Sequence, residues 1–314
     1  MQIAYTKPHL SYAEQIDLLR RRGMNIPEAD QAMLALKNIG YYRLSGYSYS
    51  FRETISGTRG ENFIPGTNFD DILNLYFFDK KLRTLLFDAM ECVEINMRVA
   101  IAHLMGSVKN FSYDNPFFLS PKFTSDANNG TSLHKKWLDK FDKNVQRHKN
   151  EYYVTHYQSK YNLPFPMWIA VQLWDFGLLS HFFSGLKPNY QQQVALGLAI
   201  PKGIYLQSWL HCLNDIRNLV AHHYRMWNHN FATQPKLPGK GEITQLDHLK
   251  LGAINKIYPC CCIIAYLLKD NPFFNKWRGS FNSHIRAFPN LSILSISDMG
   301  FPFDWDKQSI WKME

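Results

Sequence analysis

The sequence predicts a mainly helical protein, and three observations support this prediction. Apolar residues recur every three or four positions from Phe69 to Met105, a stretch that contains no proline and no glycine. Helix start signals precede several of the apolar stretches. No segment shows the clear alternation of apolar and polar residues that is typical of strands. Helices of this kind most often pack as an antiparallel bundle.

The first expected elements are two short helices. Ser11 and Glu14 have the spacing of a capping box, and the helix that they open continues through three arginines at 20–22 until Gly23 ends it. Basic residues in a last turn are favoured by the helix dipole, so these arginines need no ligand to explain them. A second helix is expected over residues 27–38, with proline in its first turn.

Aromatic rings and arginines alternate in residues 40–52, GYYRLSGYSYSFR. One interpretation is a surface on which nucleic-acid bases stack. The other is an aromatic hinge packed against the core, and we favour it for most of these rings.

A long helix is expected from Asn68, where Asp71 follows three residues later as in a start signal, and it continues to about Gly106. Glu91, Glu94 and Arg98 are three, four and seven residues apart, so they share one face of this otherwise apolar helix. Because charges are rarely buried alone, this face either meets solvent or supports a polar site.

The second half of the chain contains further expected helices. A loop or insertion is expected from 106 to about 131, where Ser, Asn, Asp, Gly and Pro accumulate, and a basic helix over about 134–157. One apolar helix is expected in MWIAVQLWDFGLLSHFF (167–183), with a glycine inside it. Another is expected from near Ser208 to His222, and a last one over 244–268 with a kink at Pro259.

Composition favours a basic protein of a reducing compartment. The 314 residues carry a net charge of +9 and 15% aromatic residues, which suits a nucleic-acid partner, although many soluble proteins are simply basic. The amino terminus has no signal-peptide pattern, and the apolar run at 260–268 is too short to cross a bilayer. Five cysteines without paired C-x-x-C spacing indicate buried apolar residues rather than disulfides or a metal site. We therefore expect a cytoplasmic protein with no membrane contact, no metal and no cofactor.

Polar residues gather in RNLVAHHYRMWNHN, residues 217–230. An arginine followed by a histidine after four to six residues occurs by chance on the order of once or twice in such a chain. The chain holds four such pairs: Arg98 with His103, Arg217 with His222, Arg217 with His223, and Arg278 with His284. Spacing alone therefore does not identify a site.

The neighbours of Arg217 set it apart from the other arginines. Asn218 and His222 lie four residues apart, so on a continued helix the amide can orient the imidazole. A histidine moves protons near neutral pH, and a guanidinium braces a phosphate. These groups suit attack of an RNA 2′-hydroxyl on the adjacent phosphate, which needs no metal.

A purely structural interpretation of residues 217–230 also exists. Arg217 would pair with a carboxylate such as Asp215 or Glu94, Asn218 would cap a helix, and His222 would be a core histidine. A zinc site built from the cysteine and histidines of this region is weaker, because their spacing matches no familiar ligand pattern.

The stretch RNLVAHHYRMWN resembles the signature of the Abi-like proteins, the AbiD and AbiF type of abortive-infection protein, within the HEPN superfamily of helical ribonucleases. Other stretches resemble the same family in the expected order: LLRRRGMNIP, IGYYRLSGY, YFFDKKLRTLLFDAMECVEINMR, PFPMWIAVQLWDFGLLS and MGFPFDW. The resemblance covers most of the chain and leaves roughly residues 107–160 without support.

The resemblance implies a HEPN four-helix bundle with a metal-independent endoribonuclease site. By position, Arg217, Asn218 and His222 match the catalytic motif, while His223 and Arg225 match its flanks. Two such motifs usually face each other, so one convincing copy implies a homodimer; Arg98 to His103 is a much weaker second copy. We expect Glu91, Glu94 and Arg98 to support the motif from the long helix. Candidate RNA-binding residues are Arg20, Arg21, Arg22, Tyr42, Arg43, Tyr47 and Arg52.

The sequence predicts three parts of the chain and leaves two alternative functions open. Residues 1–66 form an N-terminal helical segment, residues 67–285 a HEPN-like bundle with an insertion at about 107–160, and residues 286–314 a tail packed on the bundle. The first function is an endoribonuclease of an anti-phage abortive-infection or toxin-antitoxin system. The second is an RNA-binding protein that docks a small structured non-coding RNA, such as an antitoxin or guide-like RNA, without cutting it.

Overall fold

The computed structural model describes residues 4, 8–126 and 130–312, and it confirms a mainly helical fold. The helices are α1 Tyr12–Arg21, α2 Ala29–Asn38, α3 Tyr41–Ser48, α4 Phe69–Val108, α5 Pro121–Thr124, α6 Leu133–Arg147, α7 Tyr152–Lys160, α8 Met167–Ala170, α9 Phe176–Gly185, α10 Pro188–Gly197, α11 Gly203–Ala221, α12 Ile257–Leu267 and α13 Asn275–Arg286. Short 3-10 turns lie at Tyr49–Phe51, Pro116–Phe118, Val171–Leu173, Thr244–Leu251, Pro272–Phe274, Ile296–Met299, Trp305–Lys307 and Ser309–Trp311.

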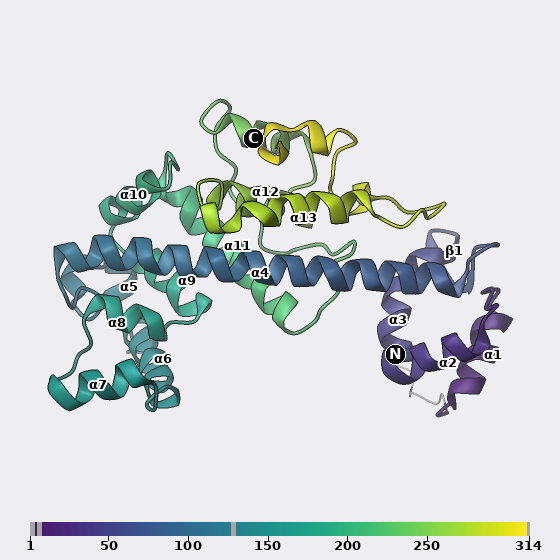
Figure 1. The fold of residues 1–314 in the computed structure, drawn as a ribbon, viewed down its shortest axis with the longest axis horizontal. Helices are drawn as coiled ribbons and strands as arrows, with labels where there is room; N and C mark the ends of the chain where they lie inside the picture. The colour runs from purple at the N-terminus through teal and green to yellow at the C-terminus, as the bar shows by residue number, and fades with distance from the viewer. Residues whose placement is uncertain (1–3, 5–7, 127–129, 313–314) are drawn as a thin grey trace.

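The long helix α4 is the scaffold of the molecule. Its 40 residues span about 60 Å and run the width of the structure (Figure 1). Helices α3, α8, α9, α10, α11, α12 and α13 all pack against it. The N-terminal helices α1 to α3 lie near its start and α5 to α8 near its end, with α12 and α13 along one side (Figure 1). Elements from both halves of the chain therefore share one core along α4.

Several predicted elements are confirmed. Ser11 and Glu14 form the capping box of α1, and Gly23 follows with a φ of +91°. Asn68 is the N-cap residue of α4, although its side-chain oxygen accepts a hydrogen bond from the amide of Asn25 rather than from the helix. The thiol-bearing residues Cys260–Cys262 are buried within α12, as expected of small apolar side chains.

Two predicted helices are interrupted. The apolar helix at 167–183 breaks because Asp175 adopts an extended conformation and its carboxylate accepts the N–H of Leu178 at 2.7 Å, which caps a new helix. The predicted helix at 134–157 divides into α6 and α7 after His148.

The prediction of one kinked helix over 244–268 is also wrong. A 3-10 turn covers Thr244–Leu251, and Pro259 lies in the first turn of the separate helix α12, where its missing N–H costs nothing.

Other elements were not expected. Helix α10 has only a small buried face around Val194, and α13 buries Trp277, Phe281 and Ile285 among polar residues and a glycine. Strands β1 Arg52–Ile55 and β2 Thr58–Phe63 form a small antiparallel hairpin. Helix α11 begins at Gly203, five residues before the predicted start. The Cα of Gly203 packs closely on α10 and leaves no room for a Cβ.

A buried carboxylate joins three segments at the start of α4. Asp79 accepts hydrogen bonds from the hydroxyl of Tyr47 at 2.6 Å and from the backbone N–H groups of Met226 and Trp227 at 3.1 and 2.7 Å. It also pairs with Arg83, one turn further along the helix. This network, which we call the Asp79 network, ties α3 and the chain after α11 to the scaffold.

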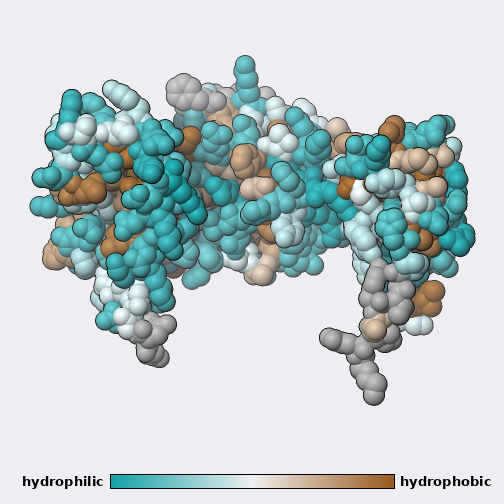
Figure 2. All heavy atoms as spheres, turned by 90° about the horizontal axis from the view of Figure 1, so that it is seen from below, coloured by the Kyte–Doolittle hydropathy of each residue, from teal (hydrophilic) through white to brown (hydrophobic). Residues whose placement is uncertain are grey.

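Most of the face seen in Figure 2 is hydrophilic, with hydrophobic side chains in small separate patches. Among the described residues, no helix combines the length and the apolar character that crossing a membrane requires.

Replacing Asp79 with alanine should lower the free energy of unfolding by about 3 to 5 kcal/mol, because it leaves the buried Arg83 without its partner. Urea unfolding followed by circular dichroism measures this difference. Asp88→Ala, an exposed position on the same helix, is the control and should change stability by no more than about 0.5 kcal/mol. Equal losses in the two variants would contradict a structural role for the network.

Candidate functional site

The C-terminal end of α11 presents two exposed histidines. His222 is the C-cap residue, and its N–H still donates to the carbonyl of Asn218 at 3.0 Å, so helical spacing holds between these two residues. His223 adopts a φ of +61°, and the N–H groups of His223 and Tyr224 donate back to Val220 and Leu219. This pairing is the Schellman closure of a helix. The chain therefore turns sharply and leaves both imidazoles at the surface.

Arg217 lies one turn earlier, beside a half-buried carboxylate. Its guanidinium is 3.9 Å from Glu94 Oε2 and donates to the side-chain oxygen of Asn218 at 3.2 Å. The other oxygen of Glu94 pairs with Arg98, which also donates to the carbonyl of Trp174. Glu94 therefore lies between two guanidinium groups. The guanidinium of Arg217 faces the carboxylate of Glu94, and because its side chain remains 32% exposed it is still open to solvent.

Burial raises the pKa of Glu94, and the charges of Arg98 and Arg217 oppose the rise. Asp175 also acts on this group by raising its pKa further. Burial alone would raise the pKa of Asp175 as well, but the N–H of Leu178, the ammonium of Lys140 and the charge of Arg217 lower it overall. The charge of Arg217 thus acts on two carboxylates whose pKa values shift in opposite directions.

A second polar cluster adjoins Arg217 at Gly177. Lys140 and Asp175 form an ion pair at 2.9 Å. A Cβ at Gly177 would lie 3.1 Å from the carboxylate of Asp175, 3.2 Å from the ammonium of Lys140 and 3.6 Å from the side-chain oxygen of Asn214. The missing side chain therefore leaves room for these groups to approach one another. Sequence reasoning missed all three polar residues, since their partners are distant in the chain.

The flanking residues of the motif, His223 and Arg225, form hydrogen bonds with α3. Arg225 donates to the backbone carbonyl of Gly46, and Arg43 donates to the backbone carbonyl of His223 at 2.6 Å. Both contacts connect the end of α11 to α3. Arg43 also lies over the ring of Tyr76, so this predicted RNA-binding residue has structural partners as well.

The remaining predicted support residues divide. Glu94 contacts Arg217, and Arg98 is linked to the motif only through Glu94. Glu94 is also one of the carboxylates that the structural interpretation paired with Arg217. Asp215 accepts a hydrogen bond from Thr233 instead. Glu91 is exposed, and within the described parts of the chain it forms no hydrogen bond or ion pair with the motif.

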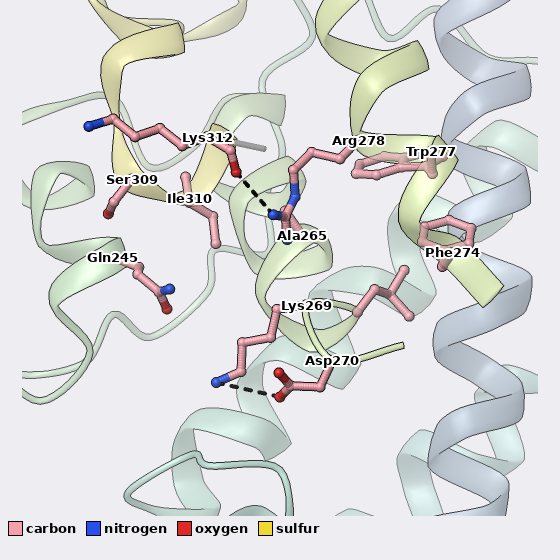
Figure 3. Close-up of a pocket in the computed structure, with 11 residues that line it drawn as sticks. Gln245, Ala265, Lys269, Asp270, Phe274, Trp277, Arg278, Ser309, Ile310 and Lys312 are labelled. Carbon is pink, nitrogen blue, oxygen red and sulfur yellow. Dashed lines mark hydrogen bonds and ion pairs between the residues drawn. The ribbon is translucent and has the colours of Figure 1, made fainter. Parts of the chain in front are cut away.

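The other arginine and histidine pairs do not form comparable sites. Arg98 is engaged by Glu94 and Trp174, while His103 is exposed further along α4. Arg278 lines a cavity of about 650 Å³ between α12, α13 and the C-terminal turns, where it donates to the carbonyl of Lys312 (Figure 3). His284 instead stacks on Phe78 and bonds its carbonyl at 3.0 Å.

Among the predicted N-terminal RNA-binding residues, Arg22, Tyr42 and Arg52 line one pocket together. Tyr47 is 1% exposed, so it has no free ring face on which a base could stack, and its prediction as an RNA-binding residue is wrong. Arg22 donates to the hydroxyl of Tyr41 and pairs with Glu61. Arg20 donates to the carbonyl of Ile26 at 3.0 Å, and Arg52 packs on the rings of Tyr49 and Phe63. Arg21 and Tyr42 are exposed. Most of this set therefore has local structural partners.

No group of three or more histidine, cysteine, aspartate or glutamate side chains in the described part of the chain has metal-binding geometry.

A family model described as Abi-like protein matches residues 34–228, well over half of the chain. The chain belongs to the Abi-like protein family. No curated protein and no solved structure showed a match. The match spans residues 107–160, for which the sequence motifs gave no support, and ends before MGFPFDW; at its start it excludes LLRRRGMNIP. Within this Abi-like range lie the Asp79 network and the residues around Arg217.

Replacing Asp175 with alanine should lower the free energy of unfolding by about 1 kcal/mol, because α9 loses its N-cap. Asp175→Asn keeps a capping oxygen and loses only the ion pair with Lys140, so a smaller loss is expected. Because the native pKa of Asp175 lies below its ordinary value of 3.8, the advantage of the wild type over Asp175→Asn should be complete above that value. It should then decline as the pH falls through the lowered native pKa. Urea unfolding across this pH range measures it, and a difference independent of pH would contradict the assignment.

Proposed function

We propose that this Abi-like protein is a metal-independent endoribonuclease of an abortive-infection or toxin-antitoxin system. The observation that supports this most directly is the end of α11, where a solvent-open guanidinium held by Glu94 lies five residues from an exposed histidine. Five residues correspond to about 7.5 Å along a helix. The same segment lies within the range of the Abi-like family match, which supports a role in abortive infection.

The proposed reaction is an internal transesterification. The 2′-oxygen of a ribose attacks the adjacent phosphorus, a 2′,3′-cyclic phosphate forms, and the 5′-oxygen leaves with a proton. His222 transfers protons, and Arg217 stabilises the charge that develops on the phosphate. Asn218 accepts a hydrogen bond from Arg217 and so orients the guanidinium, and it lies one turn before His222. Glu94 positions the guanidinium.

A second copy of the chain completes the proposed site. In the described part of the chain no hydrogen bond reaches the imidazole of His222, so nothing within one protomer orients this ring. A facing motif from a homodimer partner would supply the missing contacts. The same observation favours the alternative function, an RNA-binding protein that docks a small structured RNA without cutting it.

Alanine at Arg217 or at His222 should reduce cleavage of labelled single-stranded RNA in EDTA by at least about 100-fold, because proton transfer or charge stabilisation is lost. Matched controls are Arg278→Ala and His103→Ala, which remove the same residue types from pairs that form no site. These controls should cleave like the wild type. Binding without cleavage by the wild type, with and without EDTA, would favour the docking function instead.

The solution mass should be twice 36.8 kDa, as measured by light scattering during size-exclusion chromatography. This value follows from the need for a facing motif. A protein that cleaves RNA as a strict monomer would rule out the composite site and leave the nuclease itself intact.

A further inference from the structure

A basic pocket lies beside the candidate site, where α5 and α6 meet α9 and α11. Its volume is about 320 Å³, within the range of small-ligand pockets. Lys122, Lys136, Lys140 and His181 line it, and none of the described residues around it is acidic. Lys140 pairs with Asp175, but in the described chain neither Lys122 nor Lys136 forms an ion pair. The pocket therefore keeps an uncompensated positive charge.

The buried side chains of the lining, Phe123, Trp137 and Leu178, form an apolar floor of this pocket. Phe123 packs on the bare Cα of Gly185, where a Cβ would lie 2.3 Å from the ring. The indole N–H of Trp137 donates to the carbonyl of Leu178 at 2.8 Å, which fixes a second part of the floor. An apolar floor below a cationic rim fits a ligand with one flat apolar face and one anionic group, such as a nucleotide.

The pocket is connected to the candidate site in two ways. Lys140 belongs to its rim and pairs with Asp175, a carboxylate on which the charge of Arg217 acts. Gln207 lines the pocket from α11, ten residues before Arg217, which corresponds to about 15 Å along the helix. A single RNA strand following α11 can therefore reach both places.

We propose that this pocket binds one nucleotide of the RNA strand a short distance from the cleaved bond, with its phosphate on Lys122 and Lys136 and its base against the apolar floor. The segment at 107–160 then serves to hold RNA. This inference rests on the proposed function, because it takes RNA as the ligand.

The test is binding of a fluorescent single-stranded RNA of 20 nucleotides with every 2′-hydroxyl methylated, so that the strand cannot be cleaved. The variant Lys122→Ala/Lys136→Ala should bind about tenfold more weakly than the wild type. The slope of log affinity against log salt should fall by about 1.4, the value for two lost phosphate contacts on a single strand. Gln207→Trp, which fills the pocket without changing its charge, should weaken binding as well.

The matched control is Lys149→Ala/Lys160→Ala, which removes two exposed lysines of the same segment outside the pocket. It should change affinity by less than about twofold. If the wild type binds and cleaves RNA but the pocket variant behaves like this control, the inference fails and the nuclease stands. Normal binding by Gln207→Trp would contradict binding inside the pocket and would show that the lysines act only as diffuse surface charge. If the wild type binds no RNA, both proposals fail.

Discussion

The buried carboxylate of Asp79 is the constraint on which the arrangement of the candidate site depends. A charge removed from water is stable only when donors surround it, and this one receives the Tyr47 hydroxyl, the Arg83 guanidinium and two backbone N–H groups of the chain after α11. These donors come from three segments: α3, α4 and the chain after α11. The carboxylate therefore fixes the position of the chain that follows α11, a few residues after the exposed histidines.

The candidate site is partly buried at Arg217 and exposed to solvent at His222. Glu94 holds Arg217 from the buried side, and the Schellman closure ends α11 directly after His222. Arg43 and Arg225 then bind the turn to α3. This division explains why one short stretch contains both structural and proposed catalytic arginines. A guanidinium bonded to a backbone carbonyl positions the chain, whereas one left partly in water remains available to a phosphate.

Local signals in the sequence predicted the fold where the determining contacts are local. The capping box at Ser11, the start of α4 at Asn68 and the apolar period of that helix were all found correctly. Asp175 was not recognised as a helix break, because inside an apolar stretch one aspartate resembles a solvent-facing residue. The Asp79 network was not predictable, since its partners lie up to 148 residues from Asp79 along the chain. For the candidate site, the sequence singled out Arg217 and gave Glu94 as one of two possible carboxylate partners, whereas Lys140 and Asn214 join the cluster around Gly177 only through tertiary packing.

The central claim is that the end of α11 cleaves RNA through the substrate's own 2′-hydroxyl. The most direct measurement is the chemical nature of the new 3′ end, determined by mass spectrometry of the fragments, together with cleavage of an RNA that carries a single 2′-deoxynucleotide at the cleaved position. The account predicts a 2′,3′-cyclic phosphate and no cleavage at the deoxy position. Fragments ending in a 3′-hydroxyl, or equal cleavage of the deoxy-substituted strand, would contradict it.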